Sequence, residues 1–178
     1  MTARRSAALL AATALAAALT ACAPASTPTP SPTPTGFASE EEAFAAAEAT
    51  YRAYVDALNQ VDLSDPATFE PVYALTAGQL NEQDRKSFSE LHADGTVVEG
   101  DTQVVKIAPN EAEFPNVTLN VCTDVSQVQV TDREGKSLVA EDRPDLQART
   151  VTLSVVQADK FRIARIGDPV GGFTCAGN

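Results

Sequence analysis

The chain has 178 residues, with 24 acidic and 13 basic side chains and a formal net charge of −11. This negative charge repels the phosphates of nucleic acids, so we expect no nucleic-acid partner. The single histidine, His92, rules out a histidine-rich metal site, and we expect neither a metal nor a cofactor.

Residues 1–21 have the three parts of an export signal. Arg4 and Arg5 precede an apolar run that ends at Leu19, and small residues follow before Cys22. The apolar run is too short to span a bilayer core, which needs about 20 residues. The sequence therefore predicts a cleaved signal peptide rather than a transmembrane helix.

Residues 19–22, Leu-Thr-Ala-Cys, resemble the lipobox of bacterial lipoproteins. The resemblance implies cleavage before Cys22 and attachment of a diacylglycerol to its thiol. Two acyl chains anchor a protein stably, so we expect a lipid-anchored protein on the outer face of the cell membrane. The residues leave one alternative open, a secretory signal cut after Ala21 beside an incidental cysteine. Loss of Arg4 and Arg5 with the signal lowers the net charge by two, to −13.

Residues 22–36 read as the lipidated cysteine followed by a tether. Prolines at 24, 28, 30, 32 and 34 alternate mainly with threonine and serine, which favours polyproline II and excludes a core. At about 3.1 Å per residue, this segment reaches roughly 40 Å. Residues 37–178 are then long enough for one compact domain.

The domain should begin with three helices. Ser39 and Glu42 form a capping box, and an apolar stripe continues to Leu58 at helical spacing. Asp65 and Pro66 are typical of the N-cap and first position of a second, short helix. A third should start after Thr76, present Leu80, Phe88 and Leu91, and stop near Asp94 and Gly95.

After Gly95 the period changes to two, which predicts strands. The strands should break at Gly100 and Asp101, and residues 108–111 read as a turn. Residues 116–130 read as one strand with a bulge near Thr123 and Asp124. A hairpin turn is predicted at 132–135, and a last hairpin pairs 147–156 with 160–166 around Ala158 and Asp159.

This order resembles the nuclear transport factor 2-like superfamily, a cone-shaped fold that includes ketosteroid isomerase and limonene-epoxide hydrolase. The segments that carry the resemblance are residues 43–58, Asp65-Pro66 and 122–126 leading to Asp132 and Gly135. The chain also resembles small exported lipoproteins of high-GC Gram-positive bacteria. The expected fold class is α+β, with three N-terminal helices packed on a curved antiparallel sheet.

Cys122 and Cys175 remain as an even pair if Cys22 is lipidated. Outside the reducing cytoplasm such a pair is expected to form a disulfide. The bridge would join the C-terminal segment to a central strand.

The sequence contains no assembled catalytic set. The cone-fold resemblance suggests a pocket near Tyr51, Tyr54, Tyr73 and Asp124, in which a tyrosine and a carboxyl could act as in ketosteroid isomerase. We expect instead a non-catalytic domain that binds a small apolar ligand or an envelope protein. The alternatives are a cone-pocket enzyme and an accessory module of an envelope complex, and the fold also suggests a homodimer.

Overall fold

The computed structural model describes residues 36–157 and 159–175. The predicted signal peptide, Cys22 and the tether up to residue 35 lie outside the described residues, as does the turn residue Ala158. No helix among the described residues is long and apolar enough to cross a membrane.

The helical half of the domain comes first along the chain. Its elements are α1 (Glu40–Leu58), the 3-10 helix η1 (Pro66–Phe69), α2 (Glu70–Leu75) and α3 (Gly78–Asp94). The Ser39 hydroxyl accepts the Glu42 N–H at 3.1 Å, and the Glu42 carboxylate accepts the N–H of Ala38 rather than that of Ser39, at 2.6 Å. Asp65 caps η1, and α3 ends at Gly95, whose φ of 66° is left-handed. The three predicted helices are confirmed.

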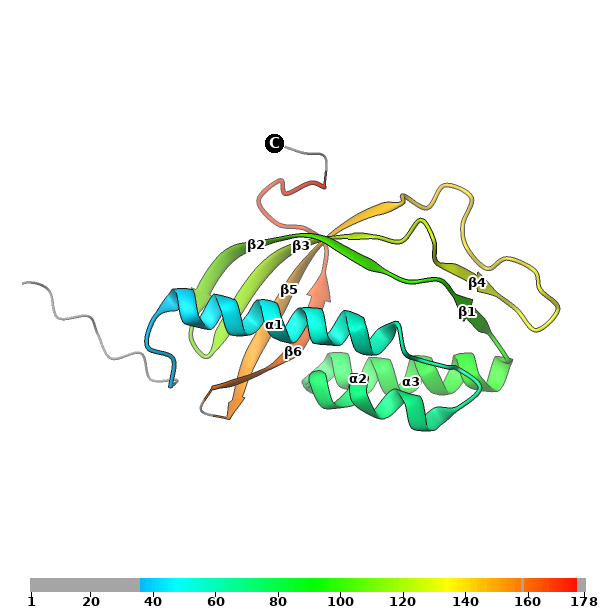
Figure 1. The fold of residues 1–178 in the computed structure, drawn as a ribbon, viewed down its shortest axis with the longest axis horizontal. Coiled ribbons are helices and arrows are strands. Elements are labelled where there is room, and N and C mark those ends of the chain that lie inside the picture. Colours follow the sequence, from blue (N-terminus) through cyan, green and yellow to red (C-terminus); the bar gives the residue numbers. More distant parts are fainter. Residues whose placement is uncertain (1–35, 158, 176–178) are drawn as a thin grey trace, which may run out of the picture. The chain divides into compact units, whose positions relative to one another are not determined.

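The second half is an antiparallel sheet with strand order β2-β3-β5-β6 (Figure 1). These strands are β2 (Gln103–Glu113), β3 (Asn116–Asp124), β5 (Leu146–Gln157) and β6 (Lys160–Gly167). A separate two-stranded ribbon pairs β1 (Val97–Glu99) with β4 (Gln129–Thr131). The ribbon projects past the end of the sheet, beyond the C-terminal end of α1 (Figure 1).

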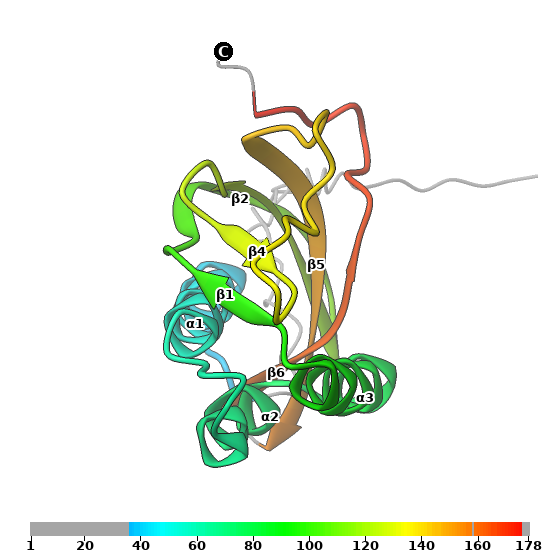
Figure 2. The same cartoon turned by 90° about the vertical axis from the view of Figure 1, so that its right-hand side faces the viewer.

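The core lies between the helices and one face of the sheet. Val117, Leu119 and Val121 alternate along β3 toward the helices and have no exposed surface. Ala43 and Ala47 of α1 are also fully buried, which lets that helix approach the sheet closely. Residues of α1, α2 and α3 contribute to this core together with residues of β3, β5 and β6, and Figure 2 shows the three helices around the lower part of the curved sheet. The predicted α+β class, three helices on a curved antiparallel sheet, is confirmed.

A smaller apolar cluster joins η1, α2 and α3. Phe69 and Phe88 have ring centroids 5.1 Å apart, and Tyr73 and Phe88 5.8 Å apart. Leu63 is buried in the same cluster. These contacts hold the end of α3 beside the segment that follows α1.

The C-terminal segment crosses the sheet face opposite the helices. Cys122 follows the core residue Val121, so its side chain points to the outer face. The structure places its Sγ at bonding distance from that of Cys175, with the Cα atoms 5.5 Å apart, as the sequence predicted. The Val170 N–H donates to the Thr150 hydroxyl at 3.0 Å. The segment therefore covers part of the outer face.

The predicted turn at residues 108–111 is wrong. Strand β2 continues through it to Glu113, and the turn follows at Phe114 and Pro115. Pro109 is tolerated because β2 is an edge strand, where a missing N–H need not break a ladder.

The predicted single strand over residues 116–130 is also wrong. Strand β3 ends at Asp124, and β4 begins at Gln129 and pairs with β1. The bulge lies on the partner strand, because Val104 pairs with Thr123 and Lys106 with Cys122, which leaves Val105 as the additional residue. The predicted hairpin over 147–166 is confirmed by β5 and β6, and a turn at 132–135 also forms.

Candidate functional site

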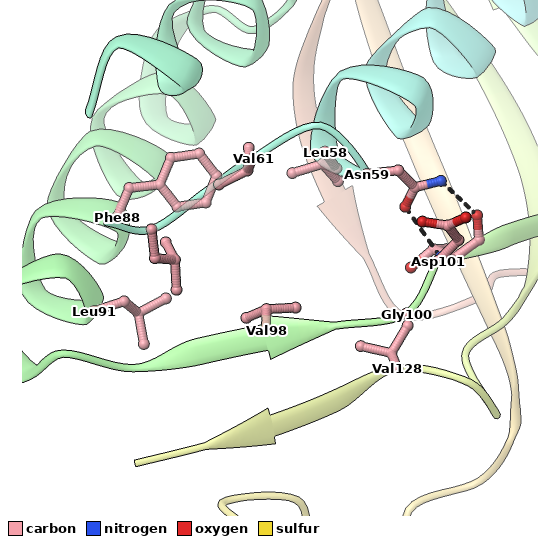
Figure 3. A pocket seen from close by; sticks show the side chains of 11 residues that line it. Leu58, Asn59, Val61, Phe88, Leu91, Val98, Gly100, Asp101 and Val128 are labelled. Carbon is pink, nitrogen blue, oxygen red and sulfur yellow. Dashed lines mark hydrogen bonds between the residues drawn. The ribbon is translucent and has the colours of Figure 1, made fainter. Parts of the chain in front are cut away.

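A groove of about 300 Å³ opens where the ends of α1 and α3 meet the β1–β4 ribbon. Figure 3 shows side chains from these elements facing one another across it. Most of its lining is apolar, from Leu58, Val61, Leu63, Phe88, Leu91, Val98 and Val128. The volume is at the lower end of the range typical of small-molecule sites.

The polar end of the groove is built on Asn59, the C-cap of α1. Its side-chain amide donates to the Thr102 carbonyl at 3.0 Å, and its side-chain carbonyl accepts the Thr102 N–H at 3.0 Å. One amide thus satisfies both backbone groups of a residue 43 positions away. The pair ties the end of α1 to the link between β1 and β2 (Figure 3).

Gly100 determines the course of that link. Its φ is +81°, and a Cβ at this position would lie 2.0 Å from the Gln127 carbonyl oxygen. Any side chain would therefore push the link away from the segment before β4. Glycine at this position lets the two segments close the end of the groove.

Asp101 lies between these two constraints and is the one ionisable residue in the groove lining. Its side chain is exposed, and its carboxylate makes no hydrogen bond or ion pair with the described part of the chain. Asn59 and Thr102 are already occupied by each other. The free acceptor at this end is therefore the Asp101 carboxylate.

A second set of polar groups lies inside the domain, on the buried faces of α1 and α3. Tyr51 and Tyr54 are buried on α1, with ring centroids 6.4 Å apart. On α3, Oδ2 of Asp84 is buried and has no hydrogen-bond partner, the one such side-chain atom among the described residues. An unpaired buried oxygen is costly and calls for an explanation, such as a bound water or a ligand.

The electrostatics link these groups. Burial raises the pKa of Asp84 to about 6, and the Thr76 hydroxyl partly offsets this shift. Burial also raises the pKa of Tyr54, and the nearby charge of Asp84 raises it further. For Tyr51, burial raises the pKa to about 12 against the opposing effect of Arg149. Asp84 is therefore the carboxyl group that raises the pKa of Tyr54.

The structure does not bring the four predicted pocket residues together, and none of them lines the groove. Tyr51 and Tyr54 belong to the main core, whereas Tyr73 lies in the smaller cluster with the Arg85 guanidinium 4.0 Å above its ring. Asp124, at the end of β3, accepts the Ser126 N–H at 2.8 Å, and this bond lowers its pKa. Asp124 thus stabilises a turn, the role that short polar residues commonly have.

His92 also has a local role. Its Nδ1 lies 2.6 Å from the Leu63 carbonyl oxygen, so the imidazole connects the end of α3 to the segment before η1. Within residues 36–157 and 159–175, no group of three or more histidine, cysteine, aspartate or glutamate side chains could hold a metal ion.

Sequence reasoning missed Asn59, Asp101 and Asp84. A signal existed for Asp84, because it stands four residues after Leu80 and four before Phe88, on the apolar stripe of its helix. No local pattern marks Asn59 and Asp101, since their positions depend on a contact between distant segments.

No family model matches the chain, and no curated protein matches it. Among solved structures, the chain is similar to a proposed aromatic ring hydroxylase from Novosphingobium aromaticivorans, with a TM-score of 0.47 and 9% identity over 75% of this chain and 97% of that one. It is also similar to a de novo β-sheet design, with a TM-score of 0.28 and 18% identity over 78% of this chain and 94% of that one. The fold class rests on the helices and sheet described above.

Proposed function

We propose that this protein is a lipid-anchored, extracytoplasmic binding protein that holds a small apolar ligand without transforming it. The observation that carries the binding function is the groove of about 300 Å³ with its mostly apolar lining. Apolar pockets with a few polar groups are the usual form of small-molecule sites. The resemblance to cone-fold proteins, whose interiors hold ligands, supports the same function.

The anchoring is supported by the sequence alone. Leu-Thr-Ala-Cys at residues 19–22 follows an export signal, and a proline-rich segment precedes Phe37, which is buried in the core. Metabolic labelling with an alkyne fatty acid should mark the wild type and not the Cys22→Ser variant. Labelling of both, or of neither, would contradict the lipid anchor.

Binding can be tested with N-phenyl-1-naphthylamine, an uncharged probe whose fluorescence rises in apolar sites. Leu91→Trp should place its indole in the groove and exclude part of the probe from the apolar walls. A loss of about 1.4 kcal/mol of apolar contact between the probe and the groove would weaken binding about tenfold. The matched control is Leu138→Trp, at a residue that is 53% exposed and absent from the groove lining. Equal binding by the two variants, or no binding by the wild type, would refute the proposal.

A second candidate function, acid–base catalysis, is favoured by one observation. Asp84 has an unpaired buried oxygen and a pKa near 6, and it lies close enough to Tyr54 to raise the pKa of that hydroxyl. If a ligand retained by the protein changes in mass or in its proton NMR spectrum during incubation, Asp84→Asn should stop the change. A ligand that stays intact with the wild type would exclude catalysis on that ligand.

A further inference from the structure

The groove does not end at its apolar lining. Beyond Asn59 and Thr102 it meets a second, polar depression, which the side chains of Arg52, Asp56 and Gln60 help to line. Asn59, Asp101 and Thr102 line both spaces. Asp101 therefore stands where the apolar groove and the polar depression adjoin, and it is the ionisable residue that lines both.

The backbone of Asp101 is held on both sides. Before it, Gly100 packs so closely on the Gln127 carbonyl that no side chain would fit. After it, Thr102 forms two hydrogen bonds of 3.0 Å with Asn59. Because both neighbours are restrained, the backbone of Asp101 is held beside the groove, which lowers the cost of ordering this residue when a ligand binds.

The charges at this junction favour a cation. Arg52, the basic residue of the polar depression, already binds Glu48 with bonds of 3.0 and 2.8 Å. Asp56 adds a second carboxylate to the depression. The groove lining contains no basic side chain, so an anionic ligand would meet negative charge without a compensating cation.

We propose that the groove selects an apolar molecule that carries an amine, with the ammonium group beside Asp101 and the apolar body between α1, α3 and the ribbon. This inference rests on the proposed binding function and adds the chemical class of the ligand. A neutral apolar compound fits the same walls but leaves the Asp101 carboxylate unpaired.

The test compares 2-naphthylmethylamine, a cation, with 2-naphthylmethanol, its neutral counterpart of nearly equal shape. The protein is the mature chain, residues 22–178, with Cys22→Ser, exported behind a secretory signal so that the disulfide can form and no acyl chain competes. Calorimetric titration measures both dissociation constants for the parent, for Asp101→Asn and for the matched control Asp142→Asn, at an exposed carboxylate that lines neither the groove nor the polar depression.

We expect the parent to bind the amine about threefold to fivefold more tightly than the alcohol, the upper part of the range for an exposed ion pair. The preference should shrink at about 0.5 M salt. Asp101→Asn should bring the ratio of the two constants to about one, whereas Asp142→Asn should keep the preference.

The outcomes separate the two proposals. If both compounds bind the parent equally, or if Asp142→Asn removes the preference as fully as Asp101→Asn, the groove binds apolar ligands but Asp101 does not select amines. If neither compound binds, the groove is not a ligand site, and the proposed function fails together with this inference.

Discussion

Replacement of Asp84 with asparagine should stabilise the domain at neutral pH. The Asp84 carboxyl is half-buried on α3 and has one oxygen without any hydrogen-bond partner. Burial raises its pKa from 3.8 to about 6, which means that the folded state disfavours the ionised form. Asparagine has nearly the same shape and no charge, so it removes the cost of burying an ionised carboxylate.

The size of the effect follows from the pKa shift. A shift of about two units corresponds to an upper limit of about 3 kcal/mol, at 1.36 kcal/mol per unit. Because the group is only half-buried, solvent screening reduces this to about 1 kcal/mol. The folded state binds a proton at Asp84 more tightly than the unfolded state does. The stabilisation from this proton is therefore complete below the pKa of Asp84 in the unfolded chain and is lost as the pH rises through about 6.

The free energy of unfolding can be measured by urea denaturation at several pH values. For the wild type it should fall between about pH 4 and pH 6 by about 1 kcal/mol more than for Asp84→Asn. The matched control is Asp124→Asn, since the pKa of Asp124 is lowered by a bond from the Ser126 N–H and its contribution is lost as the pH falls. If Asp84→Asn destabilises the protein at neutral pH, or leaves the pH dependence unchanged, the carboxyl is better satisfied than its geometry indicates.

Three further predictions concern the fold and can be checked by thermal or urea denaturation. Leu119→Ala should cost about 2 to 5 kcal/mol, because Leu119 is fully buried, and a smaller loss would mean that the core collapses around the cavity. Gly100→Ala should cost more than about 1 kcal/mol, because its Cβ would overlap the Gln127 carbonyl, and a neutral result would show that the link moves freely. Cys175→Ser should cost up to about 4 kcal/mol, because the bridge to Cys122 closes a loop of 53 residues, and an unchanged midpoint would refute this contribution.

Local signals predicted most of the helical half. The start of α1 follows from Ser39 and Glu42, and the end of α3 from Gly95, because caps depend on a few neighbouring residues. The strand errors at residues 108–111 and 116–130 have a different cause. A strand depends on its partner, so Pro109 is acceptable only because the outer side of β2 is unpaired.

In the candidate site, too, some features follow from local sequence signals and others depend on contacts between distant segments. The sequence predicted a pocket that joins Tyr51 and Tyr54 to Asp124, and in the structure Asp84, not Asp124, is the carboxyl close to Tyr54. Asp124 stood out in the sequence because it lies beside the predicted bulge. Its partner, the N–H of Ser126, is only two residues away.

The sequence by itself predicted three helices followed by an antiparallel sheet, the acidic character of the chain and the pairing of Cys122 with Cys175, and it is the basis of the export and anchoring that we propose. Each of these depends on composition or on short-range spacing. Only the tertiary structure decided where the groove lies and which side chains face it. Asn59 reaches Thr102 across 43 residues, and Gly100 packs on the segment before β4. Such contacts arise when distant segments bury their apolar faces together, and no local pattern encodes them.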